Sequence, residues 1–212
     1  MYKVKICGIL EDQHIVAAAQ SGASYVGFVF FEKSRRNVSI PTAKRLANDT
    51  PNGLVRVALL VNPSNTCINM VLENVSIDMI QLHGNETVER VDKIKSISKL
   101  PIMKAIGIKT KEDLVLINQY EVVADQILLD AKPSLNASSP GGLGKSFDWN
   151  VLSNFKSKKP WLLAGGLNAQ NVKSAIKKTG ATEFDVSSGV EDRFGVKSER
   201  KIFEFLNTLK EL

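Results

Sequence analysis

The chain has 212 residues, of which 43% are hydrophobic and 24% are charged. This composition supports a sizeable globular core and excludes a disordered chain. Its 28 Lys and Arg residues against 22 Asp and Glu residues give a formal charge of +6. The basic residues are scattered and have no aromatic residues between them, which argues against a nucleic-acid partner. The same positive charge suits small anionic ligands.

Cysteine content and hydropathy indicate the compartment. Cys7 and Cys67 are the two cysteines, and neither has CxxC or His-rich spacing, so we expect no disulfide framework and no metal site. No segment approaches the roughly 20 apolar residues that a membrane span needs, and the first residues lack the apolar stretch of a signal peptide. We therefore expect a soluble protein of the reducing cytoplasm, with no membrane partner.

A short apolar run, a polar or glycine-bearing loop and a stretch of helical period follow one another eight times along the chain. Most of the runs are apolar throughout, as parallel strands are when both of their faces are covered. Predicted strands cover residues 4–6, 25–30, 56–61, 78–82, 102–106, 126–129, 161–164 and 184–186. Predicted helices cover residues 11–21, 41–49, 65–75, 86–98, 111–123, 147–155, 169–178 and 197–211.

This rhythm predicts an α/β fold, a single (β/α)₈ TIM barrel over residues 1–212. Eight units in 212 residues leave 26.5 residues for each, which is close to the lower size limit of this fold. An open doubly wound sheet would also use such units, but no GxGxxG motif opens the first helix. The longest loop, residues 131–144, follows the sixth strand and would lie at the barrel mouth.

Two side chains at predicted strand ends are candidates for proton transfer. Cys7 ends the first strand, and although most free cysteines are small buried hydrophobes, catalytic side chains project from this end of a barrel strand. Lys5 points to the same side of the strand and would help to ionise the thiol. Asp130 ends the sixth strand and is either a turn cap or a general acid. Neither His14 nor His83 has a recognisable orienting arrangement, which disfavours a cysteine hydrolase; His83 is expected to be a packed or hydrogen-bonded neighbour.

Glycine-bearing turns follow the last two predicted strands. Gly165 and Gly166 lie in the first turn, and Ser188 and Gly189 lie in the second. Either turn alone would be weak evidence of a site, but in a barrel these two loops frequently bind phosphate through backbone N–H groups. Arg36 follows the second strand and is either part of a solvated basic loop or a fork that holds a carboxylate.

Six groups of residues stand at the predicted strand ends and in the loops after them. They are KICG at 5–8, GFVF at 27–30 with SRRNV at 34–38, QLHG at 81–84, LD at 129–130 with GGLGKSFDW at 141–149, AGGL at 164–167 and DVSSGVE at 185–191. In this combination and order the chain closely resembles the phosphoribosylanthranilate isomerase family over nearly its whole length.

The resemblance implies a cofactor-free Amadori rearrangement of N-(5-phosphoribosyl)anthranilate to 1-(2-carboxyphenylamino)-1-deoxyribulose 5-phosphate, the third step from chorismate to tryptophan. It implies these roles: Cys7 as general base, Asp130 as general acid, Arg36 for the anthranilate carboxylate, and Gly165, Gly166, Ser188 and Gly189 for the phosphate. Another phosphosugar isomerase on the same barrel and a non-catalytic phosphate binder are the alternatives. A monomer and a homodimer both stay open.

The chain departs from the family pattern at three places. Leu143 stands where the family usually has Thr or Ser, Phe194 and Ser198 stand where it tends to have Pro and Asp, and the segment between Asp130 and Gly141 is a little long. These differences concern the loops around the site and leave the expected reaction unchanged.

Overall fold

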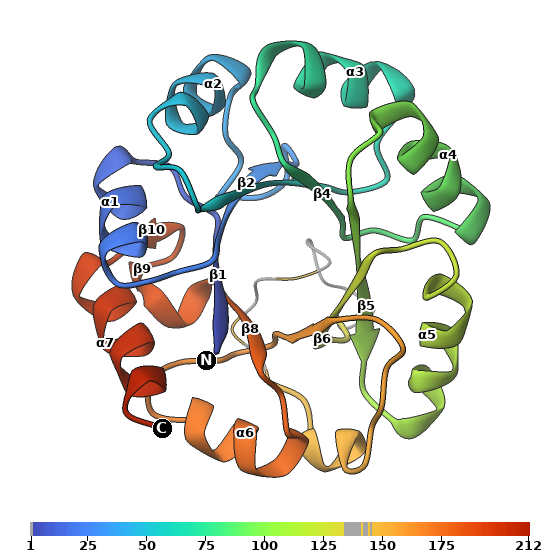
Figure 1. Cartoon of the computed structure of the whole chain (residues 1–212), viewed down its shortest axis with the longest axis vertical. Coiled ribbons are helices and arrows are strands. Elements are labelled where there is room, and N and C mark those ends of the chain that lie inside the picture. The colour runs from blue at the N-terminus through green and yellow to red at the C-terminus, as the bar shows by residue number, and fades with distance from the viewer. Residues whose placement is uncertain (1, 134–140, 142–143, 145) are drawn as a thin grey trace.

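Eight parallel strands, β1 to β8, close into a barrel in chain order in the computed structural model, which describes residues 2–133, 141, 144 and 146–212. Each strand pairs with the next, and β1 closes the ring by pairing with β8, which sets Lys5 beside Asp185. Helices surround the barrel on its outside (Figure 1). The predicted (β/α)₈ barrel is therefore confirmed.

The elements follow the predicted order with small shifts at their ends. The barrel strands are β1 Lys3–Cys7, β2 Tyr25–Phe30, β3 Val55–Leu60, β4 Met79–Leu82, β5 Ile102–Ile108, β6 Gln126–Ala131, β7 Trp161–Leu163 and β8 Glu183–Val186. The helices are α1 Asp12–Gln20, α2 Ile40–Asn48, α3 Asn65–Asn74, α4 Val88–Ser98, α5 Val115–Tyr120, α6 Val172–Thr179 and α7 Glu199–Lys210. In the described part of the chain, no helix has both the length and the apolar character to cross a membrane.

Alternation along the strands divides the buried side chains into an outer and an inner set. Outward residues such as Ile6 and Phe28 belong to the large cluster between the strands and the helices. The inner set includes an apolar layer of Met103, Ala105, Leu128, Leu162 and Ala164, and a cluster of Cys7, Val29 and Leu59 nearer the carboxyl ends of the strands. The inner layers form a packed floor beneath the mouth of the barrel, where the strands end.

Two predicted helices are wrong in extent. Residues 111–123 form a 3₁₀ turn, Lys111–Leu114, followed by the short α5, and residues 147–155 hold only the 3₁₀ turn Trp149–Leu152. Asp148 accepts a hydrogen bond from the backbone N–H of Asn150, two residues on, and Asn154 has a left-handed φ of 64°. These Asp and Asn residues favour turns over a longer helix.

A two-stranded hairpin between β8 and α7 is absent from the sequence-based prediction. It consists of β9 Glu191–Arg193 and β10 Val196–Lys197, which pair antiparallel. Figure 1 shows the hairpin on the outside of the strands, next to α1 and α7. Its position brings charged residues toward the loop after β2.

Candidate active site

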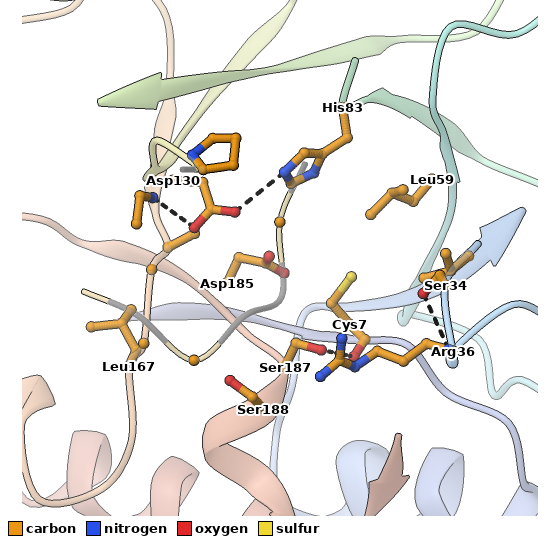
Figure 2. Close-up of a pocket in the computed structure, with 18 of the residues that line it drawn as sticks. Cys7, Ser34, Arg36, Leu59, His83, Asp130, Leu167, Asp185, Ser187 and Ser188 are labelled. Atoms are coloured by element: carbon orange, nitrogen blue, oxygen red, sulfur yellow. Dashed lines mark hydrogen bonds and ion pairs between the residues drawn. The ribbon is translucent and has the colours of Figure 1, made fainter. Parts of the chain in front are cut away.

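A cavity of about 850 Å³, open to solvent, lies at the carboxyl ends of the barrel strands. Six of the seven predicted site residues line it, namely Cys7, Arg36, Asp130, Gly165, Gly166 and Ser188. Its wall also includes His83 and Asp185. The Cys7 sulfur and the Asp130 carboxyl group point into the same space from different walls (Figure 2). The fold therefore brings six of the seven predicted residues together around one cavity.

Cys7 is placed by the last residue of β1 and is 4% exposed. A side-chain carbon added at Gly27 would lie 3.1 Å from both the Cys7 Sγ and the Lys5 Nζ, so the glycine leaves room for both groups. Burial raises the pKa of the Cys7 thiol, and although the Lys5 ammonium lowers it, the net shift is upward. Cys7 is thus a thiol next to a cation that favours its ionisation.

Lys5 is fully buried and donates a hydrogen bond of 2.8 Å to the Asp185 Oδ1 on the neighbouring strand β8. Burial alone would lower the pKa of Lys5, but Asp185 and Cys7 outweigh burial and raise it. Lys5 therefore stays charged at neutral pH. The predicted influence of Lys5 on Cys7 is confirmed in direction, although it does not overcome the effect of burial.

Asp130 projects from β6 and both of its carboxyl oxygens have partners. The backbone N–H of Ala131 donates to Oδ1 at 2.8 Å, and the His83 Nε2 lies 3.2 Å from Oδ2. A side-chain carbon on Gly141 would lie 2.6 Å from the His83 Nε2 and 2.7 Å from the Asp130 Oδ2, so the backbone of Gly141 packs directly on this pair. The Nδ1 of His83 lies 2.8 Å from the side-chain nitrogen of Gln81.

Arg36 reaches the cavity wall with its guanidinium already oriented. Its Nε and Nη2 donate to the two carboxyl oxygens of Glu191 at 2.7 and 2.9 Å, and the Phe194 ring lies 5.0 Å from the guanidinium carbon. Lys197 donates to the same Glu191 carboxylate at 2.6 Å. Burial raises the pKa of Glu191, but the hydrogen bonds and charges of Arg36 and Lys197 outweigh burial and leave it below its usual value.

The loops after β7 and β8 touch each other. Gly165 and Gly166 have φ angles of 87° and 64°, a conformation that side chains resist. Gly189 does not line the cavity; a side-chain carbon there would lie 1.8 Å from the Leu167 carbonyl oxygen. Gly189 thus lets the second loop, with Ser188 on the cavity wall, lie against the first.

Two residues of the site, His83 and Glu191, were missed or undervalued by sequence reasoning. His83 is the hydrogen-bonded neighbour that was predicted, but its partners Gln81 and Asp130 also orient its ring, which was not predicted. The signal was the Gln81–His83 spacing of two, which turns both side chains to the same side of the strand. Glu191 gave no local signal because Arg36 is 155 residues away. Residues 134–140, 142–143 and 145 of the long loop, including Leu143, lie outside the described residues.

Among residues 2–133, 141, 144 and 146–212, no three His, Cys, Asp or Glu side chains gather in an arrangement that could hold an ion. The cofactor-free reaction implied by the family resemblance stays a prediction.

Comparisons with known proteins give one consistent result. Residues 4–208 match the family model of N-(5′-phosphoribosyl)anthranilate isomerase. An N-(5′-phosphoribosyl)anthranilate isomerase of Cereibacter sphaeroides is 47% identical over 98% of this chain and 98% of its own length. The crystal structure of the Thermotoga maritima phosphoribosyl anthranilate isomerase superimposes over 100% of both chains with 36% identity and a TM-score of 0.89. A second structure of such an isomerase, in complex with reduced 1-(o-carboxyphenylamino)-1-deoxyribulose 5-phosphate, has 34% identity, a TM-score of 0.86 and full coverage of both chains.

Proposed function

Because this chain belongs to the family of N-(5′-phosphoribosyl)anthranilate isomerases, we propose that Cys7 and Asp130 perform the two proton transfers of the isomerisation. The protein is an isomerase of tryptophan biosynthesis on a TIM barrel. The observation that carries the proposal is that a thiol and a carboxyl group, from strands on different sides of the barrel, line one cavity (Figure 2).

The rearrangement needs a general acid at the ribose ring oxygen and a general base at the neighbouring sugar carbon. Asp130 donates a proton to the ring oxygen of the ribose, and the ring opens to an iminium ion. The Cys7 thiolate removes the proton from the neighbouring sugar carbon, which leaves an enolamine that tautomerises to the ketone. Each transfer contributes about 10² to 10⁴ in rate when the group is well placed. Lys5 stabilises the thiolate that this step requires.

Two anchors hold the substrate between these groups. The neighbouring structure with a bound phosphorylated product analogue supports a phosphorylated small molecule as the ligand of this cavity as well. Gly165, Gly166 and Ser188 bind its phosphate through the two touching loops, and Gly189, which does not line the cavity, allows those loops to touch. Arg36 binds the anthranilate carboxylate with the N–H groups that Glu191 leaves available, since two of its five N–H groups are used. Anchoring at both ends supplies orientation.

Replacement of the acid and the base tests this assignment. We expect Cys7→Ala and Asp130→Asn each to lower kcat by about 10² or more, with KM changed far less, because neither residue is an anchor. The measurement is loss of the substrate's anthranilate-type fluorescence with purified proteins whose circular dichroism matches the wild type. Wild-type turnover in both variants would refute the assignment. If the wild-type chain binds phosphate but converts no substrate, the alternative of a non-catalytic phosphate binder would be supported.

We also propose a cellular compartment and a domain organisation for the enzyme. Cys7 and Cys67 are both free thiols, which suits the reducing cytoplasm, and we expect residues 1–212 to act as one barrel domain. A single cooperative unfolding transition, with coincident fluorescence and circular-dichroism curves, is the expected observation.

A further inference from the structure

Gln81 is a buried polar residue to which the reaction scheme gives no role. It lies on β4, is 0% exposed, and points into the barrel beneath His83. Its side-chain nitrogen is 2.8 Å from the His83 Nδ1, and the other ring nitrogen of His83 is 3.2 Å from the Asp130 Oδ2. Among the described residues, the Gln81 Oε1 has no hydrogen-bond partner. A chain of three side chains thus leads from the barrel interior to the general acid.

The orientation of the Gln81 amide decides which protons this chain can hold. An amide nitrogen only donates, so a nitrogen facing Nδ1 forces that ring atom to accept. The ring proton then sits on Nε2 and is donated to Asp130. In that arrangement Asp130 receives two N–H donors, from His83 and from Ala131. In this tautomer Nε2 already carries a proton, so it cannot accept one from the Asp130 carboxyl group.

Rotation of the Gln81 amide by half a turn reverses which ring nitrogen of His83 carries the proton. Its two ends have similar shapes, so the rotation exchanges a donor for an acceptor at the same place. The oxygen now faces Nδ1, and that ring atom carries a proton. The His83 Nε2 and the Asp130 Oδ2 can then share one further proton between them. In this arrangement a proton on the Asp130 carboxyl group is donated to the His83 Nε2, which holds it in place for delivery.

We propose that Gln81 is a positioning residue for the general acid: its amide oxygen accepts the Nδ1–H of His83, and His83 and Asp130 thereby hold the transferable proton between them. The proposal rests on the role of Asp130 proposed above. Gln81 touches neither the substrate nor the reacting atoms, and acts through His83 alone.

Imidazole ¹⁵N NMR of the substrate-free enzyme reads the tautomer directly. The chain has only two histidines, His14 and His83, so a spectrum of His14→Gln or of His83→Gln assigns both rings. We expect the His83 Nδ1 to show the shift of a protonated nitrogen. An Nδ1 with the shift of an unprotonated nitrogen would overturn the proposal, whatever the variants below do.

Kinetics of Gln81→Met and Gln81→Glu give a second, independent test. Methionine keeps the length but offers no strong acceptor, so we expect kcat to fall about tenfold or more, with KM changed by less than about threefold, and His83 to move to the Nε2–H tautomer. Glutamate keeps an acceptor facing Nδ1, so it should retain more kcat than methionine does. The matched control is Gln126→Met, because Gln126 is also buried with an unpartnered Oε1 among the described residues but donates to Glu183 instead.

The outcomes separate this inference from the proposed function. Loss of kcat in Asp130→Asn together with wild-type kcat in Gln81→Met would overturn the role of Gln81 alone. A kcat loss of equal size in Gln126→Met would also overturn it, because the effect would then be the general cost of removing a buried amide. Wild-type kcat in Asp130→Asn would refute the acid assignment itself.

Discussion

Cys7 shows how one residue can be well placed and still need help to react. Its thiol is buried, and burial raises its pKa more than Lys5 lowers it. At pH values below the pKa of a thiol, its thiolate fraction rises about tenfold for each pH unit. We therefore expect the rate at which iodoacetamide modifies Cys7 to rise about tenfold per unit from pH 7 to 9 without reaching a plateau.

The measurement uses the Cys67→Ser variant, in which Cys7 is the remaining cysteine of the two. Mass spectrometry of the modified protein at each pH gives the rate. Cys7→Ser serves as the control for reaction at other side chains. A plateau reached below pH 8 would show a thiol more acidic than the structure indicates.

Single site residues were predictable from the sequence where they lie at the end of a predicted strand. Cys7 and Asp130 each follow an apolar run, and both line the cavity. The partners that set their behaviour were not predictable in this way, because they come from other parts of the chain. Asp185 is 180 residues from Lys5 and Glu191 is 155 residues from Arg36. Only the closed barrel and its hairpin bring these charges together.

At the scale of elements, the prediction succeeded for strands and failed where turn-forming residues interrupt a helical pattern. All eight barrel strands were found, since buried parallel strands are apolar on both faces. The helical period around Trp149 was real, but it lasted for a single 3₁₀ turn. The β9–β10 hairpin was missed because its strands have three and two residues, too few for an alternating pattern to be visible.

The contact between the loops after β7 and β8 gives an element-scale prediction. In Gly189→Ala the new carbon would lie 1.8 Å from the Leu167 carbonyl oxygen, so the two loops must separate. We expect the KM for substrate to rise about tenfold, and stability to fall by about 1–3 kcal/mol through overpacking. Steady-state kinetics and urea unfolding measure the two effects.

Gly180→Ala is the matched control for this variant. Gly180 ends α6 with a φ of 68° and has nothing within 4 Å of an added carbon. Alanine there costs backbone strain of about 1 kcal/mol without touching the site. An unchanged KM in Gly189→Ala would mean that the loops adapt and that their contact does not shape the phosphate site.

Over the whole molecule, ion pairs tie successive barrel units together. Asp78 at the start of β4 accepts hydrogen bonds from the backbone N–H, Nε and Nη2 of Arg56 on β3. Asp125 before β6 pairs with Lys95 of α4 at 2.7 Å. For Asp78 the Arg56 hydrogen bonds lower the pKa most; for Asp125 burial works against ionisation, but Lys95 and the Ile102 N–H outweigh it and the pKa is again lowered.

These lowered pKa values make the fold sensitive to acid. A carboxyl group whose pKa is lower in the folded than in the unfolded chain stabilises the fold fully above the unfolded value of about 4. Its contribution disappears as the pH falls through the folded pKa. We therefore expect the free energy of unfolding of the wild type to decrease from pH 6 to pH 3.

Asp78→Asn isolates one of these contributions, because asparagine keeps an acceptor but does not titrate. Its side chain and that of Arg56 are 38% and 27% exposed, so solvent screens the pair and we expect a loss of about 1 kcal/mol at pH 7. At pH 3 the variant and the wild type should differ less, since the wild-type carboxyl is then partly protonated. Urea unfolding at both pH values measures this, with Asp92→Asn on the exposed side of α4 as the control. A difference that stays constant between pH 7 and pH 3 would show that Asp78 contributes by hydrogen bonding alone and not by its charge.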